Sequence, residues 1–204
     1  MLITFEGIEG CGKSTQAKLL HEFFLANGRD AVLTREPGWG HMGNLIRALI
    51  LDERELELDP VAELCLFCAD RAQHVKDFIV PALKDGKLVI CDRYFDSTVV
   101  YQGYGRKLDM RFVNKIAKAS TLGTIPELTL LLNLPVRKGL ARLKGRGDLT
   151  KMDSEPLEFH EMIRQGYMVL ARREPERIIK INADREAGLI HEDIKSTVLG
   201  RLSQ

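Results

Sequence analysis

The sequence has no excess of charge of either sign and no long apolar run. Its 204 residues contain 30 Lys and Arg against 29 Asp and Glu, so no overall field favours a polyanion such as nucleic acid. The apolar run Leu128–Leu132 is far shorter than the roughly 20 residues that cross a bilayer, and no basic leader precedes an apolar segment at the N-terminus. These absences predict a cytoplasmic protein that acts on neither nucleic acid nor membranes.

Cysteine is also sparse. The four cysteines, Cys11, Cys65, Cys68 and Cys91, do not form a disulfide framework in a chain of this length without a secretion signal, which leaves reduced thiols. Cys65 and Cys68 have C-x-x-C spacing, but they lie in a predicted helix, and no second Cys or Cys/His pair completes a zinc site. Hydrophobic residues make up 45% of the chain, which is enough for one core, so we expect a single domain over residues 1–204.

Short apolar strands alternate with helical segments along the chain. The predicted strands are Leu2–Glu6, Ala31–Thr34, Leu88–Cys91, Leu128–Asn133 and Ile178–Asn182. The predicted helices are Ser14–Asn27, Gly43–Leu51, Asp59–Lys84 with a kink at Pro81, Met110–Ser120, Val136–Lys144 and Ala187–Leu202. Strands that are apolar on both faces indicate a parallel sheet with covered faces. We therefore expect an α/β fold, a doubly wound five-stranded parallel sheet with helices on both faces, whose ligands bind beyond the carboxyl ends of the strands.

A glycine-rich segment between the first strand and the first helix matches the phosphate-binding pattern G-x-x-x-x-G-K-[ST] at every fixed position. Its glycines let backbone N–H groups face a triphosphate at a helix N-terminus. The amine of Lys13 can reach the β- and γ-phosphates, and the hydroxyl of Ser14 can bind Mg²⁺. The predicted nucleotide-binding residues of this P-loop are Gly7, Gly10, Cys11, Gly12, Lys13, Ser14 and Thr15.

A carboxylate follows the third predicted strand. Asp92 stands where P-loop proteins place a metal-organising aspartate, so Ser14 and Asp92 are the predicted Mg²⁺ ligands; a turn or helix-capping aspartate is the alternative. Arg93 comes next and can bind a phosphate with two N–H groups. The segment Leu132–Pro135 lacks the guanine-binding pattern N-K-x-D, which argues against GTP. The middle third is rich in Arg, Tyr, Gln and Gly, which suits a small second substrate better than the partner-coupling segments of a motor ATPase.

Five short motifs follow one another in register: F-E-G-I-E-G at Phe5–Gly10, T-R-E-P-G at Thr34–Gly38, L-F-C-A-D-R-A-Q-H at Leu66–His74, D-R-Y at Asp92–Tyr94 with Ser97, and Y-Q-G at Tyr101–Gly103. Over nearly the whole chain they resemble the bacterial type of the thymidylate kinase family, which are P-loop nucleoside-monophosphate kinases. The resemblance implies ATP-dependent phosphorylation of dTMP to dTDP for dTTP synthesis. It also implies Mg²⁺ as cofactor, with ATP and dTMP as substrates, and a homodimer built from helices near the acceptor site.

The same resemblance implies which residues hold dTMP. Glu9, which also lies in the predicted ATP-binding loop, would hold the deoxyribose hydroxyl, and Tyr101 would fill the space of a ribose 2′-hydroxyl. Phe67 would stack on thymine, while Arg71 and Gln102 would form hydrogen bonds to its edge. The implied dTMP-binding residues are Glu9, Arg47, Phe67, Arg71, Arg93, Ser97, Thr98, Tyr101 and Gln102.

Two arginines, Arg47 and Arg93, would grip the acceptor phosphate in this scheme. From the residues alone, simpler interpretations stay open for three of the implied positions. Phe67 is then a core residue, and Arg47 and Arg71 are solvated charges on helix faces.

The polar, basic segment 142–155 resembles the lid that closes over ATP in this family. Because the P-loop carries Gly10 rather than an arginine, the resemblance implies a lid cation at the transition state, with Arg146 as the first candidate and Arg142 as a further ATP contact. The pattern R-G-x-x-D-R-x-E is altered here, since Thr150 and Lys151 replace its aspartate and its second arginine. Lysine cannot make a forked contact, which shifts weight to Arg142 and Arg146. The P-G-G-T motif is altered too and reads P-G-W-G over residues 37–40.

The predicted mechanism relies on positioning and charge, because phosphoryl transfer through a loose transition state needs little acid–base chemistry. No covalent enzyme intermediate is expected, and the predicted catalytic residues are Lys13, Asp92, Arg93 and Arg146. Two alternatives stay open: a kinase for another nucleoside monophosphate, and a P-loop nucleotide-binding regulatory module with weak ATPase activity.

Overall fold

Five parallel strands form one sheet at the centre of the computed structural model, which describes residues 1–53, 55–144 and 149–203. The strands are β1 (Leu2–Glu6), β2 (Ala31–Arg35), β3 (Leu88–Asp92), β4 (Leu128–Asn133) and β5 (Ile178–Asn182). Their order across the sheet is β2-β3-β1-β4-β5, and every neighbouring pair is parallel. The predicted doubly wound five-stranded sheet is confirmed.

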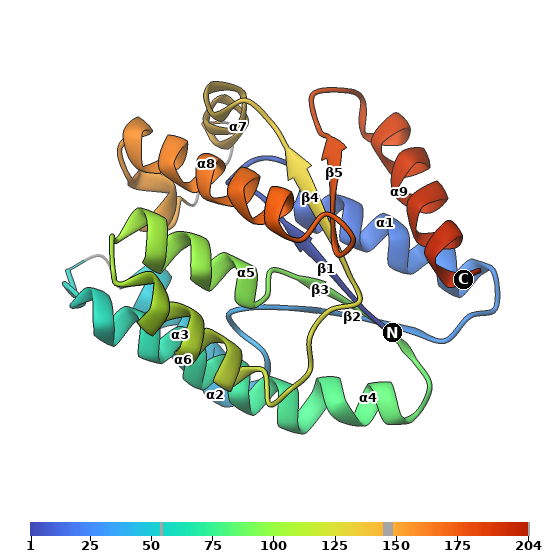
Figure 1. The fold of residues 1–204 in the computed structure, drawn as a ribbon, viewed down its shortest axis with the longest axis horizontal. Coiled ribbons are helices and arrows are strands. Elements are labelled where there is room, and N and C mark those ends of the chain that lie inside the picture. Colours follow the sequence, from blue (N-terminus) through green and yellow to red (C-terminus); the bar gives the residue numbers. More distant parts are fainter. Residues whose placement is uncertain (54, 145–148, 204) are drawn as a thin grey trace.

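Helices cover both faces of this sheet (Figure 1). They are α1 (Lys13–Ala26), α2 (Gly40–Arg47), α3 (Pro60–His74), α4 (Val80–Lys84), α5 (Phe95–Thr98), α6 (Met110–Ser120), α7 (Val136–Leu143), α8 (Leu157–Arg173) and α9 (Ala187–Leu202). Helices α1 and α9 pack together on one face, while α4 and α8 contact the strands on the other. Within the described ranges, none of these helices combines the length and the apolar character that a membrane span requires.

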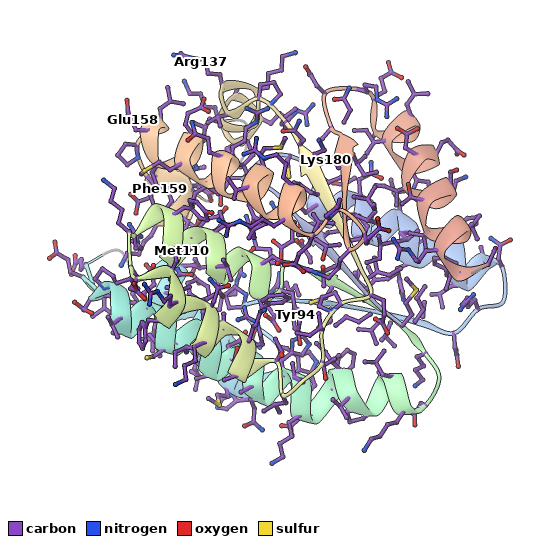
Figure 2. The ribbon with its side chains drawn as sticks, viewed as in Figure 1. Tyr94, Met110, Arg137, Glu158, Phe159 and Lys180 are labelled. Atoms are coloured by element: carbon purple, nitrogen blue, oxygen red, sulfur yellow. The ribbon has the colours of Figure 1, made fainter. Side chains whose placement is uncertain are left out.

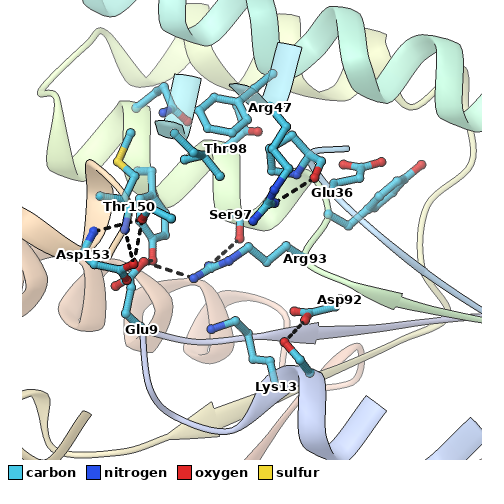
Figure 3. Close-up of a pocket in the computed structure, with 18 of the residues that line it drawn as sticks. Glu9, Lys13, Glu36, Arg47, Asp92, Arg93, Ser97, Thr98, Thr150 and Asp153 are labelled. Carbon is cyan, nitrogen blue, oxygen red and sulfur yellow. Dashed lines mark hydrogen bonds and ion pairs between the residues drawn. The ribbon is translucent and has the colours of Figure 1, made fainter. Parts of the chain in front are cut away.

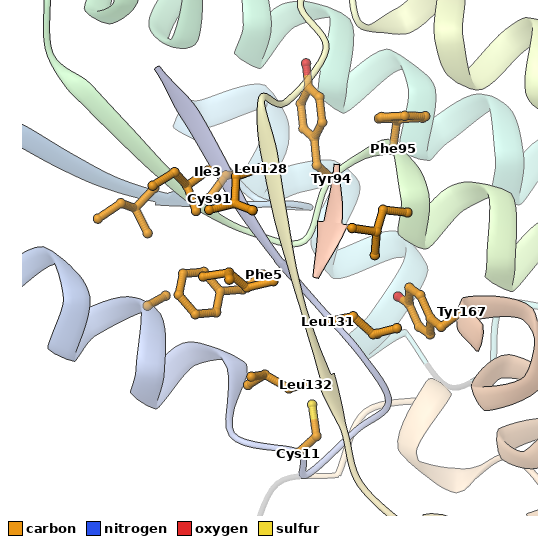
Figure 4. Close-up of a cluster of buried hydrophobic side chains, with 14 of the residues drawn as sticks. Ile3, Phe5, Cys11, Cys91, Tyr94, Phe95, Leu128, Leu131, Leu132 and Tyr167 are labelled. Carbon is orange, nitrogen blue, oxygen red and sulfur yellow. The ribbon is translucent and has the colours of Figure 1, made fainter. Parts of the chain in front are cut away.

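The apolar core lies on both sides of the three central strands (Figure 4). Phe5 and Leu132 face α1, whereas Leu131 and Tyr167 meet on the opposite side, as expected from the two-residue period of a strand. Strands β1, β3 and β4 are buried along almost their whole length, while β2 and β5 at the edges contain partly buried and exposed residues beside the buried ones. The continuous apolar strands in the sequence are therefore the central ones.

One long helix, α8, is absent from the elements predicted from sequence. Its charged and polar residues mask an apolar stripe, although Phe159, Ile163, Tyr167 and Leu170 recur at helical spacing and are all buried. The sequence also gives no clear signal for the start of this helix, because Pro156 precedes it without a side-chain cap. Helix α8 fills the stretch between the lid segment and β5, for which no element was predicted.

Two predicted helices contain π-helical turns. The helix that begins at Asp59–Pro60 continues through a π-helical turn at Val75–Ile79 into α4, directly before Pro81. Proline lacks the N–H group that a regular helix needs, which explains a change of hydrogen-bond pattern at the position where a kink was predicted. The second helix begins at Gly40, three residues before its predicted start, and ends in a π-helical turn at Ala48–Asp52.

A third π-helical turn, Val99–Gly105 (η3), extends α5 and lies between α6 and α8 (Figures 1 and 2). A Cβ on Gly103 would lie 2.4 Å from the sulfur of Met110, and one on Gly105 would lie 2.7 Å from the ring of Phe159. The two glycines therefore allow η3 to pack closely against both helices. This packing fixes the position of the Y-Q-G motif.

A buried ion pair links α5 to the start of β5. The guanidinium of Arg177 donates to both oxygens of Asp96, over 2.7 and 2.8 Å, and also to the hydroxyl of Thr129. The carboxylate of Asp96 is only 2% exposed, and the guanidinium lies 5.1 Å from the centre of the Phe95 ring. Because a buried carboxylate is costly without its partners, this pair fixes the position of α5 under the sheet.

The loop after β2 is held against α3 by charged groups. Glu36 accepts hydrogen bonds from the Nε of Arg71 (2.7 Å) and the Nδ1 of His74 (3.0 Å), and Asp70 accepts one from the backbone N–H of Gly38 (3.3 Å). The second oxygen of Asp70 is buried without a hydrogen-bond partner among the described residues. Burial, reinforced by the nearby charge of Glu36, raises the pKa of Asp70 to about 6.

Removing Arg177 should destabilise the fold strongly. The substitution Arg177→Leu leaves the buried carboxylate of Asp96 unpaired, which we expect to lower the free energy of unfolding by about 3–5 kcal/mol. The double variant Asp96→Asn/Arg177→Leu should recover part of this loss, because no buried charge remains. Urea unfolding followed by circular dichroism measures both values, and an unchanged midpoint for Arg177→Leu would contradict this role.

The pKa of Asp70 predicts a particular pH dependence of stability. Its folded-state value of about 6 lies above the unfolded value of 3.8, so its contribution to the free energy of unfolding falls as the pH rises from about 4 to 6. Asp70→Asn removes this titration. The free energy of unfolding of the variant relative to the parent should therefore rise by about 1–3 kcal/mol between pH 4.5 and pH 8. A pH-independent difference in urea unfolding would show that Asp70 titrates normally.

Candidate active site

A cavity of about 310 Å³ opens beyond the carboxyl ends of the central strands (Figure 3). It is bordered by the P-loop, the loop after β2, α3, the segment after β3 and residues 150–153. Among the residues predicted from sequence, it is lined by Glu9, Gly10, Lys13, Ser14, Arg47, Phe67, Arg71, Asp92, Arg93, Ser97, Thr98, Tyr101 and Gln102. Other predicted residues, Gly7, Cys11, Gly12, Thr15 and Arg142, do not line this cavity.

The backbone of the P-loop requires its glycines. Gly7, Gly10 and Gly12 all have positive φ angles, of 141°, 69° and 97°. A Cβ on Gly10 would lie 2.2 Å from the carbonyl oxygen of Gly139 in α7, and one on Gly139 would lie 2.5 Å from that of Glu9. The P-loop and α7 therefore touch backbone to backbone.

The amine of Lys13 folds over this loop. It donates to the carbonyl oxygens of Gly7 (3.1 Å) and Ile8 (2.8 Å), and it faces the cavity (Figure 3). These bonds hold the positive charge beside the backbone N–H groups at the start of α1. The loop thus presents the cation and the helix N-terminus that an anionic phosphate chain requires.

The two predicted metal ligands lie side by side. The hydroxyl of Ser14 donates to the Oδ2 of Asp92 over 2.5 Å, although the two residues are 78 positions apart in the sequence. A hydroxyl and a carboxylate at the phosphate-binding end of the sheet are the oxygen ligands that Mg²⁺ prefers. This pair of residues fits the predicted ion.

Arg93 connects the P-loop to the rest of the cavity. Its backbone has a φ of 70°, a left-handed conformation that costs a non-glycine residue about 1–2 kcal/mol. Its guanidinium donates to the carbonyl of Gly7 (3.2 Å), the hydroxyl of Ser97 (3.1 Å) and a carboxylate oxygen of Glu9 (3.1 Å). The guanidinium is therefore fixed between the phosphate loop and the acceptor side of the cavity.

The buried carboxylate of Glu6 holds the segment after β3, which contains Arg93, in place. Glu6 accepts hydrogen bonds from the backbone N–H of Tyr94 (2.8 Å), the hydroxyl of Ser97 (2.6 Å) and the hydroxyl of Tyr167 (2.9 Å). These donors come from the segment after β3 and from α8. Glu6 lies in the F-E-G-I-E-G motif but has no role in the sequence-based prediction, and no motif marks Tyr167.

Glu9 is surrounded by donors. It accepts hydrogen bonds from Arg93, from the hydroxyl of Tyr101 and from the Nδ1 of His160 (3.0 Å). Burial alone would raise the pKa of Glu9, but the hydrogen bond from His160 and the charges of Arg93 and Lys13 lower it to about 2. The carboxylate is ionised at neutral pH. His160 is a further site residue that the sequence patterns do not reveal, since it lies on the unpredicted helix α8.

The predicted base-binding residues converge from three segments. Arg71 is 2% exposed, and its guanidinium donates to Glu36 (2.7 Å) and to the hydroxyl of Thr98 (2.9 Å). The alternative interpretation of Arg71 as a solvated helix-face charge is therefore wrong. Phe67 is partly buried and lines the same cavity, as does Gln102.

The other predicted acceptor arginine, Arg47, is half-buried at the mouth of the cavity. It donates to the carbonyl of Pro37 (3.0 Å), which directs its side chain toward the loop after β2 (Figure 3). In that loop the unusual Trp39 stacks on His74 and packs on Phe78, with ring centres 5.5 and 5.3 Å apart. The altered P-G-W-G motif thus adds aromatic packing over the buried Glu36–His74 pair.

The lid residues are only partly described. Arg142 donates to the carbonyls of Gly10 (3.4 Å) and Ala183 (3.5 Å), so it lies beside the P-loop. Arg146, the first candidate for the transition-state cation, lies outside the described residues. The side chain of Lys151 contacts the carbonyl of Leu56, and Thr150 hydrogen-bonds to Asp153 at the cavity wall.

A buried trio, Glu36, His74 and Cys91, has ligand atoms within 4.8 Å of one another. Each of these groups already has a protein partner: Glu36 accepts from Arg71 and His74, His74 bonds to Thr34 through Nε2 (2.8 Å), and Cys91 donates to the carbonyl of Arg93. The trio is therefore part of the hydrogen-bond network behind the cavity. Glu36 had appeared in the T-R-E-P-G motif without an assigned role.

The whole chain is similar to known enzymes. The family model described as Thymidylate kinase matches residues 5–194. The thymidylate kinase of Desulfovibrio desulfuricans is 52% identical over 192 residues, which cover 91% of this chain and 88% of the relative. That of Desulfosudis oleivorans is 47% identical over 191 residues, which cover 90% and 89% of the two chains.

A solved structure agrees with these sequence relatives. The crystal structure of thymidylate kinase from Ehrlichia chaffeensis superposes with a TM-score of 0.79 at 31% identity, and the match covers 97% of this chain and 98% of the other. The resemblance inferred from five short motifs is confirmed, and the chain belongs to the thymidylate kinase family.

Proposed function

We propose that this chain transfers the γ-phosphoryl group of ATP to dTMP, which yields ADP and dTDP. One observation carries the proposal beyond family membership. The P-loop and the cavity that holds Phe67 and Arg71 are continuous, and Arg93 contacts both sides of the junction. A donor phosphate and an acceptor phosphate can therefore be held next to each other in one cavity.

On the donor side, backbone N–H groups and Lys13 bind the triphosphate of ATP. Ser14 and Asp92 would hold Mg²⁺, because both offer oxygen ligands and these oxygen atoms lie 2.5 Å apart. When bound, the ion neutralises charge on the phosphate oxygens. Arg142 reaches the carbonyl of Gly10, which supports a role for the lid segment 142–155 at the same phosphates; Arg146 remains the proposed transition-state cation.

On the acceptor side, Arg47 and Arg93 bind the phosphate of dTMP through charge-assisted hydrogen bonds. Glu9 accepts the hydrogen bond of the deoxyribose hydroxyl, and its low pKa keeps it an acceptor throughout the neutral range. The ring of Tyr101, whose hydroxyl donates to Glu9, occupies the space beside that sugar. This contact supports selection of deoxyribose over ribose.

The base lies between Phe67 and the polar groups of Arg71 and Gln102, with Ser97 and Thr98 completing the wall. Phe67 supplies a flat apolar face, and Arg71 supplies fixed N–H donors, because Glu36 and Thr98 immobilise its guanidinium. A pocket of this composition suits a pyrimidine that carries carbonyl groups.

No step of this reaction needs a protein acid or base. Lys13 and Arg93 hold the transferred group between donor and acceptor, and their charges oppose the repulsion between the two phosphates. The regulatory-module alternative is not favoured, because it gives no reason for a complete acceptor pocket beside the P-loop. A kinase for another nucleoside monophosphate would differ only in the groups around Phe67. Activity measured with different monophosphates distinguishes that alternative from a dTMP kinase.

A homodimer is part of the proposal. Helices α2, α3 and α6 pack side by side. Exposed apolar side chains project from this layer and from the π-helical turn that follows α2, namely Met42, Leu45, Leu49, Val61 and Phe112. A second copy of the chain would remove this apolar surface from water. We also propose that residues 1–204 form one P-loop kinase domain and that the enzyme works in the cytoplasm.

Turnover should depend on Lys13 and on dTMP. A coupled ADP-release assay with Mg-ATP is expected to give the highest kcat/KM for dTMP in a panel with dUMP, dCMP, AMP and GMP. Lys13→Ala should lower kcat by at least about 100-fold, because a phosphate-binding charge is lost, while its thermal unfolding stays close to that of the parent. Near-normal turnover of this variant would contradict the mechanism, and ATPase activity indifferent to every monophosphate would support the regulatory module.

The dimer should depend on the layer formed by α2, α3 and α6. Leu45→Glu places a charge on this surface and is expected to shift the protein from dimer to monomer in sedimentation experiments. Leu189→Glu on α9 is a matched control, since Leu45 is 56% and Leu189 55% exposed. A parent chain that sediments as a monomer, or a dimer lost equally in both variants, would contradict this interface.

A further inference from the structure

One side chain in the cavity has a fixed end and an unused end. Gln102 is 1% exposed and lines the cavity, and its Nε2 donates to the Oε1 of Glu63 over 2.9 Å. Its Oε1 is buried and has no hydrogen-bond partner among the described residues. A buried carbonyl oxygen without a donor costs free energy, so a ligand that supplies an N–H group at this point is favoured.

The direction of this amide is set by Glu63. Glu63 is 5% exposed, and its two oxygens accept hydrogen bonds from the Nε (3.0 Å) and Nη2 (3.1 Å) of Arg106. The same guanidinium binds Glu155 over 2.6 Å and lies 5.0 Å from the centre of the Phe159 ring, which holds it in place. A carboxylate paired with arginine can only accept hydrogen bonds. Only the NH₂ end of Gln102 can therefore face Glu63.

The result is a defined pattern of donors and acceptors in the base pocket. Gln102 keeps a carbonyl oxygen, which only accepts, and Arg71 in the same cavity only donates. Thymine offers an N3–H donor next to its O4 acceptor, which complements this pattern. Cytosine has an acceptor at N3 and an amino group in place of O4. Its N3 would face the acceptor oxygen of Gln102, and its amino group would face the donors of Arg71.

We propose that Glu63, held by Arg106, selects dTMP over dCMP by fixing the direction of the Gln102 amide. Glu63 does not touch the base in this scheme; it is a positioning residue whose effect passes through Gln102. The proposal rests on the proposed dTMP kinase function and adds the group that determines pyrimidine specificity.

The variant Glu63→Gln tests this directly, because a neutral amide can both donate and accept and so lets Gln102 turn over. We expect the ratio of kcat/KM for dTMP to that for dCMP to fall by about 10- to 100-fold, with an absolute rise for dCMP and little change in the KM for ATP. A purely structural defect would lower kcat/KM for both substrates together and would not raise activity on dCMP.

Glu155→Gln is the matched control. It makes the same chemical change at the other carboxylate bound to Arg106, but the amide of Gln102 donates to Glu63 and not to Glu155 in the network described above. Its dTMP-to-dCMP ratio should equal that of the parent. An unchanged ratio in Glu63→Gln, or an equal loss in both variants, would overturn the role of Glu63.

A test in the parent enzyme covers the case in which Glu63→Gln fails to fold. The monophosphate of N3-methylthymidine carries a methyl group in place of the N3 proton and keeps both carbonyl groups of the base. We expect its kcat/KM to be at least about 100-fold below that of dTMP, since the oxygen of Gln102 stays unpaired. Equal turnover of the two would overturn the inference, whereas a parent enzyme inactive on dTMP itself would overturn the proposed function instead.

Discussion

Two buried carboxylates at the carboxyl end of β1 need hydrogen-bond donors that the strand itself cannot supply. Glu6 receives them from the turn after β3 and from α8, and Glu9 receives them from Arg93, Tyr101 and His160. Because an unpaired carboxylate in the interior is costly, these distant segments can pack correctly only when they meet at β1. The same contacts that satisfy the carboxylates bring the phosphate loop and the acceptor cavity together.

Local motifs account for the parts of the site that could be predicted from sequence. The P-loop pattern specifies glycines, Lys13 and Ser14 within eight residues, and Asp92 follows an apolar strand, so the pairing of Ser14 with Asp92 follows from parallel strands that end at one edge. The apolar central strands were equally visible, since burial on both faces leaves no polar alternation. The resemblance to a known family then supplied the acceptor residues that line the cavity.

The supporting groups could not be predicted, because their partners are far away in the sequence. His160 and Tyr167 lie on α8, whose apolar stripe is masked by charged neighbours, and their bonds to Glu9 and Glu6 span more than 150 positions. Glu63 lies one turn from Phe67 in α3 and has no motif of its own. Its importance appears only when η3 packs between α6 and α8 and brings Gln102 and Arg106 to it.

The close approach of Gly10 and Gly139 has a mechanical consequence. No side chain separates the P-loop from α7 at this point, and side chains are the parts of a protein that adjust most easily to small displacements. A shift of α7 would therefore move the phosphate loop with it rather than be absorbed between them. Helix α7 leads directly into segment 142–155. Through the contact between the two glycines, the position of α7 and the position of the bound phosphates therefore constrain each other.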